Sequence, residues 1–518
     1  MNRKVSTKNP FLVGLFLLAA GVPCAVAQTT DAGKKAPDMS PGATILPGPP
    51  AEGSFTPDPP YLDPYDANEQ LKIYSTEPDE NGKLPRHMNP NPTGVPPVEL
   101  GIRLYDRGAY TPRSTWLFGP KDPGAFGFMT YGDLRIAGDS YDNGKGAGKQ
   151  SVVAARLNLD MDLALTPTER IHAFARPLDK NNSFTRYAIS GTDKDKFIHK
   201  FDFDLDTLFF EGDAGQISGG LMGKPAKFDL PIAIGRMPFV AQNGVWIEDA
   251  FDGAAMSITA KNIPSLDVSN IDVTFFAANA QVTTAAAAGS KNGVYGFAGF
   301  ADARKGYIEF GYGYLKADND NLSYSNVTAA FTRRYKGRLS NSIRVIDNFG
   351  QKGIPGQAKT ADGLLVLVEN SLTPKYLPLA LGNQSNFVPY LNVFAGFNSP
   401  QSLARGGDSG GVLRNTGITF ESDGMTAYPT LDATARKSYG GALGLEYLFE
   451  LQQQIVVEGS VVQRMSGNTL GSQYGIGVRY QRPISPDLII RFDAMKGWLQ
   501  GPGQKDIYGV RAELRLKF

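Results

Sequence analysis

Hydrophobic and polar residues alternate along most of this chain, and the alternation begins near Val98. A period of two predicts β-strands that have one apolar and one polar face. The same pattern recurs in segments such as 153–164, 201–209, 308–314 and 474–480. The clearest example is the last strand, whose apolar face is formed by Tyr508, Val510, Ala512, Leu514, Leu516 and Phe518. The chain is therefore predicted to be all-β.

Strand lengths and connections distinguish a membrane barrel from a soluble sandwich. The predicted strands run to about ten residues, which suits a tilted strand crossing a bilayer, whereas soluble strands average about five or six. Short links at 166–168 and 482–487 contrast with longer polar connections at 281–291 and 398–411. We predict a transmembrane antiparallel up-and-down β-barrel of about 18 strands, with 16 the next choice, because bacterial barrels use even numbers. A barrel of this size encloses an aqueous lumen.

The N-terminal part predicts export and a separate arm. Arg3 and Lys4, an apolar run at 11–20 and the small residues Ala25 and Ala27 form a signal peptide over 1–27, with cleavage near Ala27. Residues 28–97 are rich in Pro and are expected to form a largely disordered periplasmic arm, a candidate for binding a periplasmic partner. The barrel takes up residues 98–518. We expect the outer membrane of a Gram-negative bacterium, with the membrane lipids as partners.

Two features of the predicted strands concern assembly and the lipid interface. The terminal Phe518 resembles the signal that outer-membrane barrels present to the barrel-assembly machinery, which is thus another expected partner. Aromatic residues near strand ends are candidates for a girdle at the headgroup level. These are Tyr307, Tyr312, Tyr314, Tyr474, Tyr480 and Trp498.

The face opposite the apolar one should line the pore. Glycines at 311, 313, 475 and 477 fall on this face and would leave pore volume. The charged pore-lining candidates are Arg156, Arg236, Arg334, Arg344, Arg479, Arg491, Arg511, Arg515, Asp202, Asp204 and Asp206. Further acids expected in the lumen are Asp160, Glu446, Glu458, Asp493 and Glu513. The arginines could select anions by bidentate pairing, or the mixed charges could form the solvated wall of a general porin.

One stretch carries a resemblance to a known family. Ile234–Phe239, Gly244–Asp249 and Phe251–Ala254 resemble the strand, loop and returning strand of the alginate-export family of outer-membrane channels. The resemblance covers about 20 residues and implies an arginine-lined pore for an anionic polysaccharide. Met237 and Pro238 depart from the polar pair expected there.

The function predicted is passive diffusion of small hydrophilic solutes, which include anionic sugars or oligosaccharides. A formal charge of +1 gives no reason to expect nucleic acid. Because the single Cys lies in the signal peptide and no His/Cys spacing suits a metal, we expect neither cofactor nor metal site. A plugged, adhesive or cytochrome-sheathing barrel remains the alternative, since the longer loops could fold inward or outward.

An enzyme is not expected, and an outer-membrane hydrolase is the second alternative. Gly407–Gly411 has the sequence of a serine-peptidase nucleophile loop, but such an enzyme needs a general base. Only His87, His172 and His199 are available, and none has a matching context.

Overall fold

The computed structural model describes residues 100–101 and 127–518, apart from 145–147, 167, 181–182, 225, 288, 290, 375–385, 406–410, 422–426 and 450–452. The predicted signal peptide with its cleavage site, and the predicted Pro-rich arm, lie outside the described residues.

The described chain is built almost entirely of strands. Those that form the wall are β2 (Gly127–Asp142), β3 (Gln150–Ala164), β4 (Arg170–Ala175), β6 (Ser183–Ser190), β7 (Lys196–Ile198), β8 (Leu205–Asp213), β9 (Pro231–Ala241), β10 (Ile247–Ile263), β11 (Val268–Ala280), β12 (Gly293–Ala303), β13 (Gly306–Lys316), β14 (Tyr324–Tyr335), β15 (Leu339–Phe349), β16 (Leu364–Leu372), β17 (Asn386–Phe397), β19 (Ser438–Phe449), β20 (Gln453–Arg464), β21 (Gln473–Pro483), β22 (Leu488–Leu499) and β23 (Ile507–Lys517). The remaining elements are β1 (Leu100–Gly101), β5 (Asp179–Lys180), β18 (Ala404–Arg405), α4 (Ala214–Met222) and the 3-10 turns η1 (Pro264–Leu266), η2 (Asp320–Leu322) and η3 (Arg414–Thr416).

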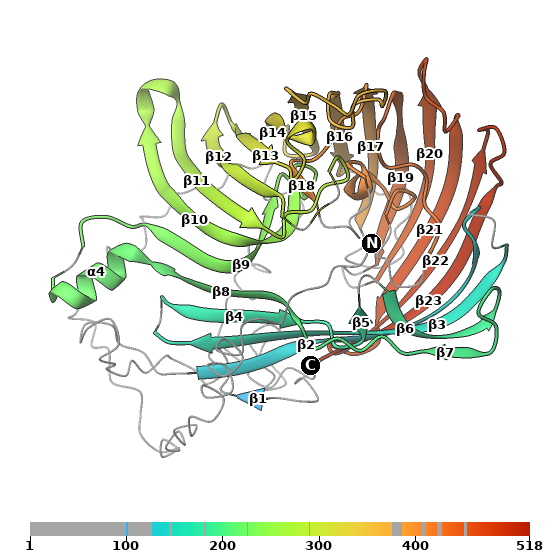
Figure 1. Ribbon diagram of the computed structural model, residues 1–518, viewed down its shortest axis with the longest axis horizontal. Coiled ribbons are helices and arrows are strands. Elements are labelled where there is room, and N and C mark those ends of the chain that lie inside the picture. The colour runs from blue at the N-terminus through green and yellow to red at the C-terminus, as the bar shows by residue number, and fades with distance from the viewer. Residues whose placement is uncertain are drawn as a thin grey trace.

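The wall strands form one closed antiparallel ring (Figure 1). Each pairs with the next along the chain, and β23 pairs with β2 to close it. Two wall positions consist of two short strands each: β4 and β6 both pair with β3, while β8 pairs with β4 and β7 with β6. The result is a closed barrel of 18 strands, which confirms the predicted all-β fold and strand number.

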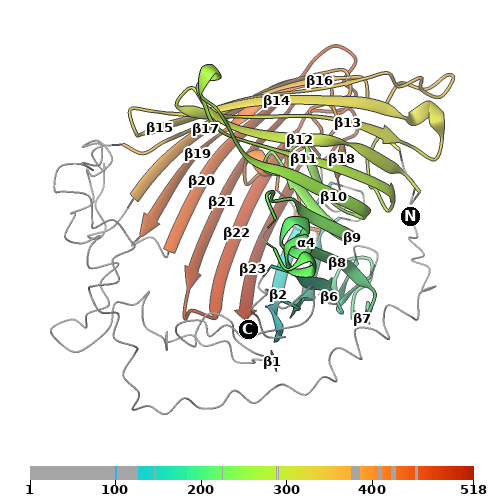
Figure 2. The ribbon, with the colours of Figure 1, turned by 90° about the vertical axis from the view of Figure 1, so that its left-hand side faces the viewer.

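The two ends of the barrel differ in their connections. We call one the short-turn end, because turns such as 304–305, 336–338 and 484–487 join the strands there. The other is the long-loop end, with connections at 281–292, 350–363 and 398–437. Figure 2 shows β19 to β23 side by side in the wall, with the C-terminus at the short-turn end.

The connection from β8 to β9 at the short-turn end contains α4. Its N-cap is Asp213, whose carboxylate accepts a hydrogen bond from the Gln216 amide, and it ends at Gly223 in the left-handed conformation. In the described part of the chain, no helix has the length and apolarity needed to cross a membrane.

Alternation along each strand gives the wall an apolar outer face and a polar inner face. In β23, Val510 is 56% exposed and Leu514 41%, whereas Arg511 and Glu513 on the inner face are 5% and 3% exposed. Of the six girdle candidates, Tyr312, Tyr314, Tyr474, Tyr480 and Trp498 lie on outer positions of their strands. Tyr307 does not: it alternates with them and faces inward, so this part of the prediction is wrong.

A second departure from the predicted strands lies at 201–209. Only the part from Leu205 onward is strand β8, and residues 199–204 interrupt the wall between β7 and β8. Asp202 and Asp204 lie in this interruption, where the amide of Asp204 donates to the Asp202 carboxylate over 3.1 Å. Alternating charge alone did not reveal that the strand is broken.

The main hydrophobic cluster lies inside the barrel. Trp246, Leu403, Leu413 and Phe420 are all fully or almost fully buried in it, and all come from connections at the long-loop end. The lumen is therefore partly packed with protein, which corrects the expectation of an open aqueous interior.

The lumen-facing glycines make room for these inward connections. A Cβ on Gly311 would lie 2.3 Å from the Trp246 ring, and one on Gly313 would lie 2.0 Å from the Leu403 side chain. Gly475 and Gly477 face Leu431 and Thr419 in the same way. The glycines occupy the predicted face, but the space they leave is filled by loop side chains.

We predict that Gly311→Val displaces Trp246, since a branched side chain cannot share this space with a buried indole. Tryptophan emission of the refolded protein should shift to longer wavelength, and protease should cut the inward connections faster. The matched control is Gly459→Val, where a Cβ meets nothing within 4 Å. Equal emission and cleavage in the two variants would contradict this packing.

Candidate functional site

Two connections from the long-loop end enter the lumen and meet there. The inward turn is residues 242–246 between β9 and β10, and the inward segment is residues 399–437 between β17 and β19. The amide of Leu403 donates to the Trp246 carbonyl over 2.8 Å, and β18 then pairs in parallel with the start of β10. The Trp246 indole N–H donates to the side chain of Asn326 on β14 over 2.8 Å. Together the two connections narrow the lumen.

Ionic contacts also join the inward segment to Glu248 at the start of β10. The Arg405 guanidinium donates to Glu248 over 3.0 Å, and that of Arg414 lies 3.4 Å from the same carboxylate. Burial lowers the pKa of Arg405 to about 10, although Glu248 opposes this shift. Arg405 is still protonated at neutral pH, so this contact is a buried ion pair.

Glu458 on the inner face of β20 anchors the middle of the inward segment. Its side chain is completely buried and accepts hydrogen bonds from the amides of Ile418 and Thr419, each over 2.9 Å. The hydroxyls of Thr419, Tyr390 and Ser460 also donate to it, over 2.7, 2.5 and 3.0 Å. A buried carboxylate needs such a shell because an unpaired one is strongly destabilising. Glu458, which was expected to line the lumen, therefore binds the inward segment to β20.

Three of the predicted arginines surround one carboxylate on the inner wall. Asp493 accepts from Arg479 over 2.7 Å and from both Arg491 and Arg511 over 2.8 Å. Arg479 also donates to Glu421 of the inward segment over 2.6 Å. These arginines lie on β21, β22 and β23, and their charges are largely compensated within the protein.

A row of three arginines crosses the neighbouring strands. Arg135 on β2 lies directly opposite Arg156 on β3 and Arg515 on β23. Like charges directly opposite one another are destabilising, so a row of them has a cost to folding and marks a candidate binding surface. Two carboxylates pair with the row: Asp133 with Arg135 and Arg515, and Glu513 with Arg515. The Arg156 guanidinium donates to Asn158 over 2.9 Å and lies over the ring of Phe184.

Arg135 was not among the predicted pore residues. Its strand carries the same signal as the others, since Asp133, Arg135 and Asp139 alternate with Leu134 and Ile136. The inner arginines of the row and of the Asp493 cluster together form what we call the arginine wall, on β21, β22, β23, β2 and β3.

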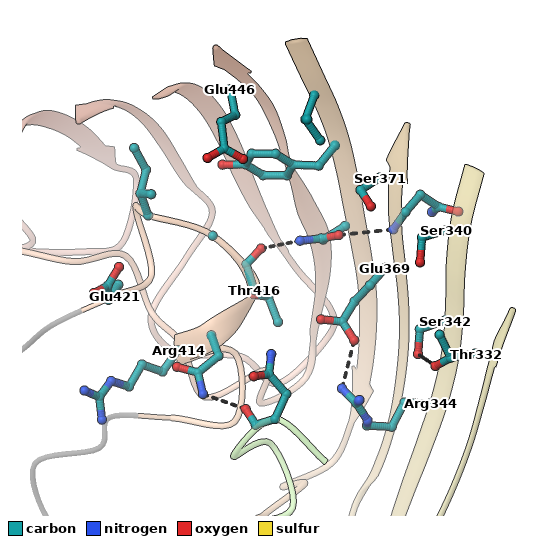
Figure 3. Close-up of a pocket in the computed structure, with 18 of the residues that line it drawn as sticks. Thr332, Ser340, Ser342, Arg344, Glu369, Ser371, Arg414, Thr416, Glu421 and Glu446 are labelled. Carbon is teal, nitrogen blue, oxygen red and sulfur yellow. Dashed lines mark hydrogen bonds and ion pairs between the residues drawn. The ribbon is translucent and has the colours of Figure 1, made fainter. Parts of the chain in front are cut away.

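A polar pocket of about 1030 Å³ lies between the inward segment and the opposite wall (Figure 3). Its lining residues on β15, β16 and β17 lie toward the short-turn end, where β15 begins, β16 ends and β17 begins. On its wall Arg344 donates to Glu369 over 2.8 Å and lies 3.7 Å from Glu309. Glu446 also lines the pocket, and the described residues provide no ion pair to it.

The remaining predicted pore residues lie elsewhere. Arg236 makes a bidentate contact with Asp252, at 2.8 and 3.1 Å, and shares the outward face of β9 with Ile234 and Val240. Arg334 is exposed at the short-turn end of β14, and Asp206 accepts two hydrogen bonds from Arg176, each over 2.9 Å. The structure thus brings Arg479, Arg491, Arg511, Arg515 and Arg156 to adjoining strands, with Arg344 in the pocket.

The chain terminus completes the closing seam of the barrel. The Phe518 amide donates to the Gly132 carbonyl over 3.1 Å, and the Gly132 amide donates to the Phe518 carbonyl over 3.0 Å. Phe518 is therefore an integral part of the β2–β23 pairing.

The histidines and the peptidase-like fragment are not brought together. His172 contacts the Asp162 carboxylate over 2.8 Å in the wall, and His199 lies between β7 and β8. Ser409 and most of its fragment lie outside the described residues, as does His87. Nor do the described residues place three His, Cys, Asp or Glu side chains where they could share a metal ion.

Comparisons with known proteins give structural similarity only. Neither a protein-family model nor a curated protein matches the chain. Among solved structures, Pseudomonas aeruginosa OpdK matches with 11% identity over 76% of this chain and 98% of its own, at a TM-score of 0.49. Acinetobacter baumannii OccAB4 matches with 9% identity over 77% and 99%, at 0.48, and Pseudomonas aeruginosa OccK5 with 13% over 76% and 98%, at 0.46. The function is therefore argued from this chain's own residues.

We predict that Glu458→Ala releases the inward segment from the wall. Five hydrogen bonds to this carboxylate are lost, and bonds to a charged group contribute about 1.5–3 kcal/mol each. Hydrogen exchange at the amides of residues 414–421 should become much faster, while the wall strands stay protected. Glu446→Ala, on the adjacent strand, serves as the control and should leave this segment protected. Equally slow exchange in both variants would show that Glu458 is not the anchor.

Proposed function

We propose that this protein is an outer-membrane channel for passive diffusion of small hydrophilic solutes in a Gram-negative bacterium. The observation that carries the proposal is the closed ring with an apolar outer face and a charged inner face. In lipid every backbone polar group must be paired within the protein, and a closed barrel achieves this without a free edge. Membrane lipids would contact the outer face, and solutes would pass through the lumen.

We also propose the orientation and the route to the membrane. Long loops face outward and short turns face the periplasm in bacterial barrels, which places the polar pocket on the periplasmic side. The signal peptide over 1–27 would direct export, and Phe518 would present the terminal strand to the assembly machinery. The role of Phe518 is supported by its place in the seam where β23, the last strand along the chain, pairs with β2.

We further propose that the arginine wall favours anionic solutes, among them sugar acids and oligouronates. Guanidinium groups bind carboxylates in a bidentate geometry. The row of Arg135, Arg156 and Arg515 supports this, because three guanidinium groups lie at directly opposite positions on the inner face of β2, β3 and β23. The alginate-export resemblance points to the same class of solute, since it implies an arginine-lined pore.

The inward segment gives the plugged or sheathing barrel a specific argument in its favour. A segment packed across the lumen reduces the cross-section available to solutes. The rival function thus makes a direct counter-prediction, namely that the folded barrel carries no ionic current.

The first prediction of the channel function concerns current in a planar bilayer under a salt gradient. The refolded barrel should give steady single-channel current with an anion-selective reversal potential, because fixed arginine charge attracts anions. Added oligouronate should block it. Current that is unselective and unblocked would leave a general porin, and a folded, inserted barrel without current would favour the plugged barrel.

The second prediction concerns the arginine row. The double variant Arg135→Gln and Arg156→Gln should lower the anion-to-cation permeability ratio by roughly twofold or more, since two fixed positive charges leave the wall. Arg236→Gln is the control, because this arginine is paired with Asp252 on the outward positions of β9 and β10. The same ratio in the double variant and the control would remove the row from the conducting path.

A further inference from the structure

The polar pocket has a side-chain composition unlike that of the arginine wall. All its lining residues except Val388, Gly417 and Ile418 carry polar side chains, and many of these are hydroxyls and amides. Its volume of about 1030 Å³ lies at the upper end of the range for small-molecule sites, about 300–1,000 Å³. The pocket can therefore hold a solute of several rings' size and surround it with donors and acceptors.

The pocket lining carries more carboxylates than guanidiniums, and several of these groups are paired within the protein. Glu369 and Glu309 share Arg344, Arg414 is paired with Glu248, and Glu421 is bound by Arg479. An ion entering the pocket would have to compete with these pairs. Paired carboxylates and guanidiniums keep spare lone pairs and N–H groups, so the pocket offers hydrogen-bonding capacity beside the negative charge of Glu446.

Arg344 and Glu369 present a paired guanidinium and carboxylate on the wall of the pocket. The Arg344 side chain is only 4% exposed, and its Nε–H makes no hydrogen bond in the structure. A buried donor left without an acceptor costs about 1–3 kcal/mol. That N–H is enclosed by protein, so a ligand in the pocket would meet the neighbouring Glu369 instead, to whose carboxylate a bound hydroxyl could donate (Figure 3).

Aromatic surface completes the lining. Tyr307 stacks on Phe300 with ring centroids 5.3 Å apart. Tyr390 on β17 reaches along the inner face, past β19, to donate to Glu458 on β20. Both tyrosines line the pocket. The C–H faces of sugar rings pack on aromatic faces, whereas their vicinal hydroxyls suit planar carboxylate, amide and guanidinium groups. This combination of surfaces fits a polyhydroxylated ring.

We propose that the polar pocket is a binding site for a neutral sugar, of mono- to disaccharide size, separate from the arginine wall. The inference rests on the proposed channel function for the ligand's route, because the sugar would reach the pocket through the lumen. The binding itself depends only on the pocket residues. A site built to hydrogen-bond hydroxyls discriminates strongly against analogues that lack them, so the pocket would give the channel a preference for sugars.

The test uses the full-length refolded protein with maltose, a neutral disaccharide, as the probe. Maltose should reduce single-channel current in a saturable way, with half-block at millimolar concentration. Ser371→Phe, which fills the pocket from β16, should weaken this block at least tenfold. Thr259→Phe, at an inner position of β10 away from the pocket, is the matched control and should leave the block within twofold of the unmodified protein.

A second comparison separates a neutral sugar from a cation. Glucosamine, which carries an ammonium group, and Glu446→Gln, which keeps a planar side chain but removes its charge, probe this alternative. Maltose block should persist in Glu446→Gln. Block by glucosamine but not maltose, abolished in Glu446→Gln, would overturn the proposal in favour of a cation site.

Failure of the channel and failure of the pocket are distinguishable. Normal current with no saturable block by maltose would overturn the sugar site and leave the channel intact. If the folded barrel carries no current, equilibrium dialysis with labelled maltose in detergent tests the site directly. Binding that Ser371→Phe removes and Thr259→Phe retains would support it, and no binding would overturn it.

Discussion

The pairing of β23 with β2 gives every wall strand a neighbour on both sides, and the rest of the structure depends on this closure. Once the ring is closed, backbone hydrogen bonds are satisfied within the wall, and each strand is left with one outer and one inner face. Apolar side chains such as Val510 then lie on the outer face, while most charged ones, such as Arg511, lie on the inner face. The charged side chains are consequently concentrated in the lumen, where burying a charge without a partner is destabilising.

Most of those charges hold the interior together. Glu458 and Asp493 each collect several donors, and Arg405, Arg414 and Glu421 extend the contacts into the inward segment. Buried pairs of this kind add little net stability, yet removing one partner is expensive. Their role here is to fix the position of the inward segment in the lumen. The arginines predicted to select anions therefore include several that hold the interior of the barrel together.

Sequence periodicity predicted the architecture because the face of a strand residue depends only on its parity. The outward tyrosines Tyr312, Tyr314, Tyr474 and Tyr480 and the inner positions of Gly311 and Gly477 follow from that rule, while the number of 18 strands came from the alternating segments and the even strand numbers of bacterial barrels. Parity could not show that residues 199–204 interrupt the wall, nor that the connection after β17 folds inward. Those features depend on contacts between distant residues, such as Leu403 with Trp246. Arg135, by contrast, carried the signal and could have been found from its strand.

The inward segment divides the interior into two sides of different chemistry. On the side of β21 to β3, the guanidiniums of Arg479, Arg491 and Arg511 share Asp493, so their ability to attract a further anion is reduced. On the same side, the row of Arg135, Arg156 and Arg515 adds three guanidiniums on β2, β3 and β23. On the side of β13 to β17, Glu309 and Glu369 share Arg344, so hydrogen-bonding groups there lie in a wall with an excess of carboxylates. Since Glu421 contacts Arg479 and also lines the pocket, the position of the inward segment couples the two surfaces, and a solute bearing both a carboxylate and hydroxyls could engage both sides.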